Sequence, residues 1–166
     1  MREPVASSDA HVSENTIDVS ASPEQVFDVL DDAYAYSKWV VGARRIRSVD
    51  PEWPAVGTRF HHAVGVEGAE LHDWSRVCER DRPRHLDLEV RFRPTGIARV
   101  TIDVEPTSDG ARILLGESPT GGPAALLPAW VSGPLLRGRN WLSLQRLRHE
   151  VERRATRGGS GTRGDG

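Results

Sequence analysis

The last third of the chain carries the longest helical pattern. Between residues 134 and 154, one set of positions recurs at three- and four-residue steps and so shares a helix face: Leu136, Asn140, Leu144, Leu147 and Val151. Charged residues, mostly arginine, occupy much of the remaining surface. The pattern predicts an amphipathic helix that begins near Pro134, because proline suits a first turn. We expect its leucines at 136, 144 and 147 to be buried.

Most of the preceding chain has the pattern of β-strands. Apolar and polar residues alternate in segments separated by turns rich in Gly, Pro and Asp: residues 11–20, 44–49, 58–66, 71–79, 84–93, 97–105 and 111–118. In the fifth segment, the residues on one face are all apolar: Leu86, Leu88, Val90 and Phe92. Most connections are short enough to join antiparallel neighbours, so we predict a seven-stranded antiparallel sheet.

Two short helices are expected after the first strand. Ser22 can cap a helix, Pro23 suits its first position, and Gln25 can complete a capping box. A second short helical piece is expected over residues 33–39. The predicted fold is therefore α+β, with a sheet whose apolar face is covered by the long C-terminal helix.

Length and composition are typical of one soluble domain. The chain has 166 residues and a net charge of −2, which gives no indication of binding to nucleic acid or acidic membranes. A single cysteine, Cys78, allows no internal disulfide, and no apolar run reaches the roughly 20 residues of a membrane helix. The polar N-terminus lacks the apolar core of a signal peptide, so we expect a cytoplasmic protein, either a monomer or a homodimer.

Four short motifs, taken in order, resemble one known superfamily. They are residues 17–27 (IDVSASPEQVF), 36–39 (YSKW), 57–60 (GTRF) and 77–84 (VCERDRPR). Over residues 12–153 the chain resembles polyketide cyclase/dehydrase-type members of the SRPBCC superfamily, to which START proteins and the birch-pollen allergen belong. The resemblance implies a helix-grip fold, in which a curved sheet wraps around the C-terminal helix and leaves a cavity for apolar or aromatic molecules. It assigns no catalytic residue, because the family shares no single catalytic motif.

The domain expected from these patterns leaves short segments at both ends. We predict a helix-grip domain over residues 11–155, a disordered N-terminus over residues 1–10, and a flexible Gly- and Arg-rich tail over residues 156–166.

Sequence motifs for metal or nucleotide cofactors are absent. The chain has no zinc-protease His pair, no paired-cysteine motif, no P-loop, no dinucleotide-binding glycine pattern and no serine nucleophile elbow. His61 and His62 are adjacent, but neighbouring side chains of a strand point to opposite faces, so this pair cannot chelate one metal. We therefore expect neither a metal nor a cofactor.

The hairpin over residues 58–79 indicates which sheet face lines the cavity. If the loop covers residues 67–70, the cross-strand pairs are Val66 with Leu71, Val64 with Asp73, His62 with Ser75, and Phe60 with Val77. The face that carries these residues is the more apolar of the two, so we assign it to the interior. Trp74 and Cys78 then lie on the outer face.

His62, Asp73 and Ser75 form a polar group on this inner face. In the predicted register His62 is diagonal to Asp73, within side-chain reach. A carboxylate near an imidazole fixes its tautomer and raises its pKa, which is the arrangement that general acid–base catalysis uses. The alternative is a polar cluster that only orients a ligand.

Other inward positions are candidate contacts of a small molecule. Trp39 and Trp130 lie in irregular helical regions, where the implied fold has its cavity mouth. Asn140 either faces the cavity or bonds to backbone, whereas Glu117 is expected in solvent at the end of its strand. The candidate ligand-binding residues are Trp39, Phe60, His62, Ser75, Leu88, Val90, Trp130 and Asn140.

Three functions remain open at this point. The first is a carrier or binding domain for a hydrophobic, aromatic or lipid-like molecule. The second is a cyclase or dehydratase in which His62 and Asp73 move protons on a bound polyketide. The third is a protein-interaction module of the chaperone-activator type. An enclosed cavity favours the first two, and a filled interior with an exposed apolar patch favours the third.

Overall fold

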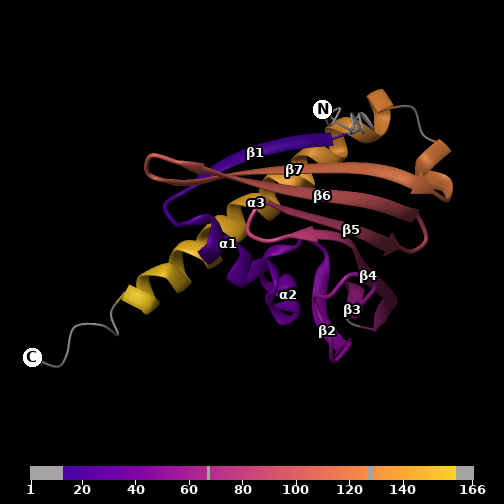
Figure 1. Ribbon diagram of the computed structural model, residues 1–166. Helices are drawn as coiled ribbons and strands as arrows, with labels where there is room; N and C mark the ends of the chain where they lie inside the picture. Colours follow the sequence, from indigo (N-terminus) through magenta and orange to yellow (C-terminus); the bar gives the residue numbers. More distant parts are fainter. Residues whose placement is uncertain (1–12, 67, 127–128, 160–166) are drawn as a thin grey trace, which may run out of the picture.

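The computed structural model describes residues 13–66, 68–126 and 129–159, with the backbone alone at 66, 124 and 129–132 (Figure 1). Its elements, in chain order, are β1 (Ser13–Val19), α1 (Pro23–Leu30), η1 (Ala33–Ala35), α2 (Tyr36–Trp39), β2 (Ala43–Val49), β3 (Arg59–Val66), β4 (Ala69–Asp81), β5 (His85–Phe92), β6 (Gly96–Thr107), β7 (Gly110–Gly121), η2 (Pro123–Leu126) and α3 (Ala129–Gly159). The predicted α+β, helix-grip fold is confirmed. The predicted disorder of residues 1–10 lies outside the described residues, as does the tail beyond residue 159. Within the described residues, no helix combines the length and apolar character needed to cross a membrane.

The capping box at the start of α1 forms as predicted. The Ser22 side chain accepts a hydrogen bond from the backbone nitrogen of Gln25 at 3.3 Å, and the Gln25 side chain accepts one from the backbone nitrogen of Ser22 at 2.9 Å. Two donors that a helix start would leave free are thus satisfied. This fixes α1 so that Val26, Phe27 and Leu30 are buried.

The seven strands form one antiparallel sheet in the order β1-β7-β6-β5-β4-β3-β2. Strands β2 to β7 each pair with their sequence neighbours, whereas β1 pairs with β7, from Ser13 opposite Glu117 to Val19 opposite Ala111. The first strand therefore joins the sheet beside the last, on the edge opposite β2.

The register of β3 and β4 differs from the prediction by two residues. His62 pairs with Asp73 and Phe60 with Ser75, because the hairpin closes between Val66 and Ala69. The predicted pairs, His62 with Ser75 and Phe60 with Val77, are wrong. Because side chains alternate with a period of two, a shift of two leaves every residue on its predicted face.

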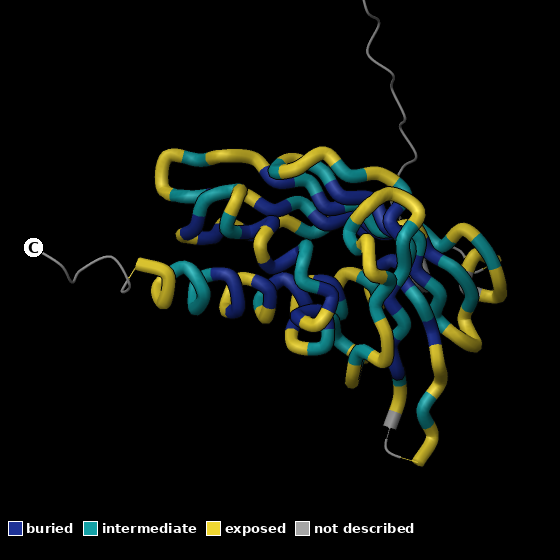
Figure 2. Tube along the Cα trace, turned by 60° about the horizontal axis from the view of Figure 1, so that its bottom comes forward, coloured by how far each residue is buried: buried dark blue, intermediate teal, exposed yellow. Residues whose placement is uncertain are grey.

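Helix α3 is longer than predicted at both ends. It is helical from Ala129, so Pro134 lies inside it, and it continues to Gly159, into the segment expected to be a flexible tail. Leu144, Leu147 and Val151 are fully buried, as predicted, but Leu136 is only half-buried. Buried and exposed positions alternate along the helix in Figure 2, because one face meets the rest of the protein and the other meets solvent.

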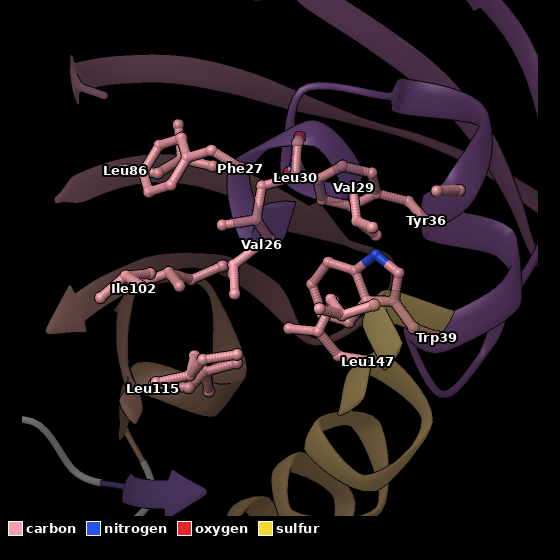
Figure 3. Packing of buried hydrophobic residues seen from close by; sticks show 14 of the residues in the cluster. Val26, Phe27, Val29, Leu30, Tyr36, Trp39, Leu86, Ile102, Leu115 and Leu147 are labelled. Atoms are coloured by element: carbon pink, nitrogen blue, oxygen red, sulfur yellow. Dashed lines mark hydrogen bonds between the residues drawn. The ribbon is translucent and has the colours of Figure 1, made fainter. Parts of the chain in front are cut away.

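The core lies between the sheet and the helices. Figure 3 shows Val26, Phe27 and Leu30 of α1 beside Leu86, Ile102 and Leu115 of the sheet, with Leu147 of α3 closing the cluster. Helix α3 contacts β1, α1 and α2. This arrangement leaves the middle strands of the sheet facing α2 and the first half of α3, and the cavity lies there.

Candidate functional site

A cavity of about 50 Å³ lies between the sheet, α2 and α3. Its lining is mainly apolar and comes from all three parts: Trp39, Val40, Ala43, Phe60, Val64, Leu88, Val90, Phe92, Val100, Ile102 and Leu115. The polar side chains in the lining are Tyr36, His62, Ser75, Glu117, Arg139, Asn140 and Ser143. His62 and Ser75 were predicted to share the inner face with Leu86, Leu88, Val90 and Phe92. The last three line the cavity with them, and Leu86 is buried in the hydrophobic core.

His62 is the polar residue at the β3 side of the cavity. It is 4% exposed, and its Nδ1 atom has no hydrogen-bond partner among the described residues. Burial lowers the pKa of His62 below its usual value, although the nearby charge of Asp73 acts in the opposite direction. The imidazole is therefore neutral at pH 7, with one ring nitrogen able to donate and the other to accept a hydrogen bond.

Asp73 lies opposite His62 in the sheet, but its carboxylate bonds to other residues. It accepts a hydrogen bond from the backbone nitrogen of Arg93 at 2.9 Å, and it lies 3.3 Å from Nε of Arg93 and 3.4 Å from Nε of Arg91. Asp73 is fully buried, so these contacts compensate a buried charge. His62 and Asp73, the predicted acid–base pair, are therefore direct cross-strand partners. The Asp73 carboxylate, however, bonds to Arg91 of β5 and to Arg93 in the turn that follows β5.

Aromatic rings form the wall between α2 and β3. Tyr36 lies 4.9 Å from Trp39 and 4.8 Å from Phe60, measured between ring centroids. The hydroxyl of Tyr36 donates to the backbone oxygen of Leu30 at 2.9 Å, which fixes its ring. Trp39 is 3% exposed and lines the cavity. The backbone of Trp130 belongs to the first turn of α3, and its side chain lies outside what the structure describes.

The opposite side of the cavity holds a buried glutamate. Glu117 of β7 is 2% exposed, and its Oε2 atom accepts hydrogen bonds from Nδ2 of Asn140 at 2.8 Å and from Nη2 of Arg139 at 2.5 Å. Arg139 also lies over the ring of Phe92, 4.9 Å from the centroid. The expectation that Glu117 lies in solvent is wrong, because two donors from α3 compensate its burial.

Sequence reasoning missed Arg139 as a site residue. The helical pattern placed it on the charged side of α3, yet its side chain is only 27% exposed and reaches back to β7. Two signals were available: Glu117 continues the inward positions of Ile113 and Leu115, and Arg139 directly precedes the inward Asn140. Asn140, predicted as a ligand contact, lines the cavity and is held by Glu117.

One group of side chains outside the cavity has the composition of a metal site. Among the described residues, Glu79, His85 and Asp87 place possible ligand atoms within 4.8 Å of one another. Asp87, however, bonds to Arg99 at 2.5 Å, and Nδ1 of His85 lies 2.6 Å from a carboxylate oxygen of Asp103. These contacts tie β5 to β6, so we interpret the group as a cross-strand polar network.

Comparisons with known proteins identify a matching family and several structures with the same fold. The model of the family described as "polyketide cyclase / dehydrase and lipid transport" matches residues 10–155. No curated protein matches the chain. Among solved structures, CV1439 from Chromobacterium violaceum is similar at 21% identity and a TM-score of 0.64, over 84% of this chain and 96% of that one.

Two further structures share the fold. The first is Ara h 8.0201, with 15% identity and a TM-score of 0.63, over 83% of this chain and 95% of that one. The second is the di-domain ARO/CYC StfQ from the steffimycin biosynthetic pathway, with 14% identity and a TM-score of 0.66. The second match covers 86% of this chain and 51% of StfQ. At these identities the similarity concerns the fold alone.

Proposed function

Because the chain belongs to the polyketide cyclase/dehydrase and lipid transport family, we propose that it binds a hydrophobic, aromatic or polyketide-like molecule between the sheet and α3. One observation carries the proposal. The cavity is lined mainly by apolar side chains, and His62 lies in that lining with a buried nitrogen that has no partner in the described chain. A few polar groups in an apolar pocket are the usual composition of a small-molecule site.

Ligand entry requires the cavity to widen. Its volume of about 50 Å³ is well below the 300–1,000 Å³ of typical ligand sites. The first half of α3 is the part best suited to move, because between residues 133 and 139 only Gly133 is buried. From Asn140 to Val151 the helix is fixed by its buried face. We propose that the part of α3 before Asn140 shifts outward when a ligand enters.

His62 is the proposed orienting group for an oxygen of the ligand. Replacing His62 with alanine is expected to weaken binding by about 0.5–1.5 kcal/mol, the net value of one hydrogen bond. The matched control is His61→Ala, because His61 lies on the same strand and points to the other face. Quenching of tryptophan fluorescence by an aromatic ligand measures the affinity, since Trp39 lines the cavity and indole emission responds to nearby rings.

Equilibrium dialysis of the same ligand tests the location of the site, because it does not depend on the fluorescence of Trp39. Trp39→Ala should weaken binding together with His62→Ala, while His61→Ala leaves it unchanged. A saturable ligand whose affinity is unaffected by both Trp39→Ala and His62→Ala would place the binding site elsewhere. Trp130 remains a proposed contact and can be tested by the same substitution.

A cyclase or dehydratase activity is the second candidate, and the lowered pKa of the His62 imidazole in the cavity lining supports it. A histidine whose pKa is lowered by burial is in its basic form at pH 7 and can accept a proton from a bound substrate. If His62 is the base, His62→Ala should reduce turnover of a polyketide substrate about 100-fold or more while binding stays nearly intact. Comparable loss of binding and turnover would instead assign His62 to ligand orientation alone.

A further inference from the structure

Glu117, at the β7 side of the cavity, has one carboxylate oxygen to which no described residue donates a hydrogen bond. Both hydrogen bonds to Glu117, from Asn140 and from Arg139, go to the same oxygen, Oε2. The other oxygen, Oε1, accepts no hydrogen bond from the part of the chain that the structure describes. Glu117 belongs to the cavity lining, and the residue is 2% exposed. A carboxylate can accept about four hydrogen bonds, so Oε1 has acceptor capacity left for a ligand in the cavity.

The two residues that donate to Glu117, Arg139 and Asn140, also bond to each other. The guanidinium of Arg139 bonds to Glu117 and to the side-chain oxygen of Asn140, and it lies over the ring of Phe92. The amide of Asn140 donates to Glu117 at 2.8 Å. Arg139 is the one arginine or lysine among the described lining residues, and its positive charge balances the negative charge of Glu117, so the site has no excess positive charge for an anionic ligand.

From this geometry we propose that the ligand carries a neutral hydrogen-bond donor, a phenol or an alcohol, that bonds to Oε1 of Glu117. A ligand carboxylate at the same place would set two negative charges side by side in an apolar environment, where their repulsion is strong. The cavity therefore selects hydroxyl-bearing aromatic molecules and rejects carboxylate-ended ones such as fatty acids. This inference rests on the proposed function of the same cavity.

The rest of the lining places the body of the ligand. Glu117 lies on β7 and His62 on β3, with β6, β5 and β4 between them in the sheet. Strands lie about 4.8 Å apart, so β7 and β3 are roughly 19 Å apart along the curved sheet. The side chains between them, such as Leu88, Val90 and Ile102, are apolar. The hydroxyl of the ligand therefore lies at β7, and its rings lie over β6 and β5.

Three probes with the same ring system test the selection without any variant. Equilibrium dialysis at pH 7 compares 2-naphthol, naphthalene and 2-naphthoate, which carry a hydroxyl, a hydrogen and a carboxylate on the same ring carbon. We expect 2-naphthol to bind about tenfold more tightly than naphthalene, from one hydrogen bond to a charged acceptor, and 2-naphthoate to bind more weakly than both.

The variant Glu117→Gln assigns the effect to the carboxylate. It keeps the size of the side chain and removes its charge, so the preference for 2-naphthol over 2-naphthoate should fall at least tenfold. The matched control is Glu14→Gln on the neighbouring strand, where the side chain is exposed, and it should leave the preference unchanged. Circular dichroism verifies the fold of both variants, and the wild-type comparison stands even if Glu117→Gln does not fold.

The outcomes separate this inference from the function on which it rests. If the three probes bind with equal affinity, or 2-naphthoate binds best, the selection by Glu117 is overturned while the hydrophobic site stands. If none of the three binds, the proposed function fails together with the inference.

Discussion

Replacing Leu144 with alanine is expected to lower the free energy of unfolding by about 2–5 kcal/mol. Leu144 is 0% exposed and packs in the core cluster at the centre of α3. The loss combines the transfer free energy of the removed carbon atoms with the cost of the cavity they leave. Urea denaturation, followed by circular dichroism, measures the change from the shift in the midpoint.

The adjacent helix surface provides the control for this substitution. Leu142 lies two residues away on the same helix and is 40% exposed, so Leu142→Ala should change the free energy of unfolding by no more than about 0.5 kcal/mol. An unchanged midpoint for Leu144→Ala would contradict the packing of α3 against the core.

Acidification is expected to remove on the order of 1–3 kcal/mol of stability through Glu150, because solvent screening reduces the full value of the pKa shift. Burial raises the pKa of this carboxyl, but hydrogen bonds from Arg153 at 2.7 Å and Arg154 at 2.8 Å outweigh burial and lower the pKa from 4.5 to about 2. The folded pKa lies below the unfolded one, so the contribution is complete above pH 4.5 and is lost as the pH falls toward 2.

The variant Glu150→Gln isolates this contribution from other carboxylates. The difference in unfolding free energy between wild type and Glu150→Gln should be largest near neutral pH and shrink as the pH falls through the window between the two pKa values. Glu152→Gln is the matched control, because Glu152 lies on the same helix and pairs with Arg148 in a more exposed position. A constant difference across the pH series would show that Glu150 does not titrate in this way.

The elements of the fold could be predicted because each has a distinct pattern. The two-residue alternation of the strands, the three- and four-residue steps of α3, and the capping box at Ser22 depend only on nearby residues. The register of β3 and β4 could not be predicted. A hairpin in which Val66 pairs with Ala69 and one in which Val66 pairs with Leu71 place the same side chains on the same face. The apolar pattern therefore does not distinguish the two registers.

The apolar lining of the site could be predicted, but its polar network could not. Positions such as Phe60, Leu88 and Val90 follow from strand alternation. The burial of Glu117 depends on a partner, Arg139, that a different element brings to it from the far side of the cavity. An arginine next to an inward position can point to solvent or fold back over the core, and only the packing of α3 on β7 decides between them.

The pairing of β1 with β7 has a consequence for the order in which the protein folds during synthesis. Strands β2 to β6 pair with sequence neighbours and can associate as they leave the ribosome, whereas β1 has no partner strand until these five and then β7 have emerged. Helix α1 also lacks most of its packing partners at that stage, because it packs on β6, β7 and α3, and α3 emerges last. Until then the nascent chain exposes Phe27 and Leu30 of α1, the kind of apolar surface that chaperones protect.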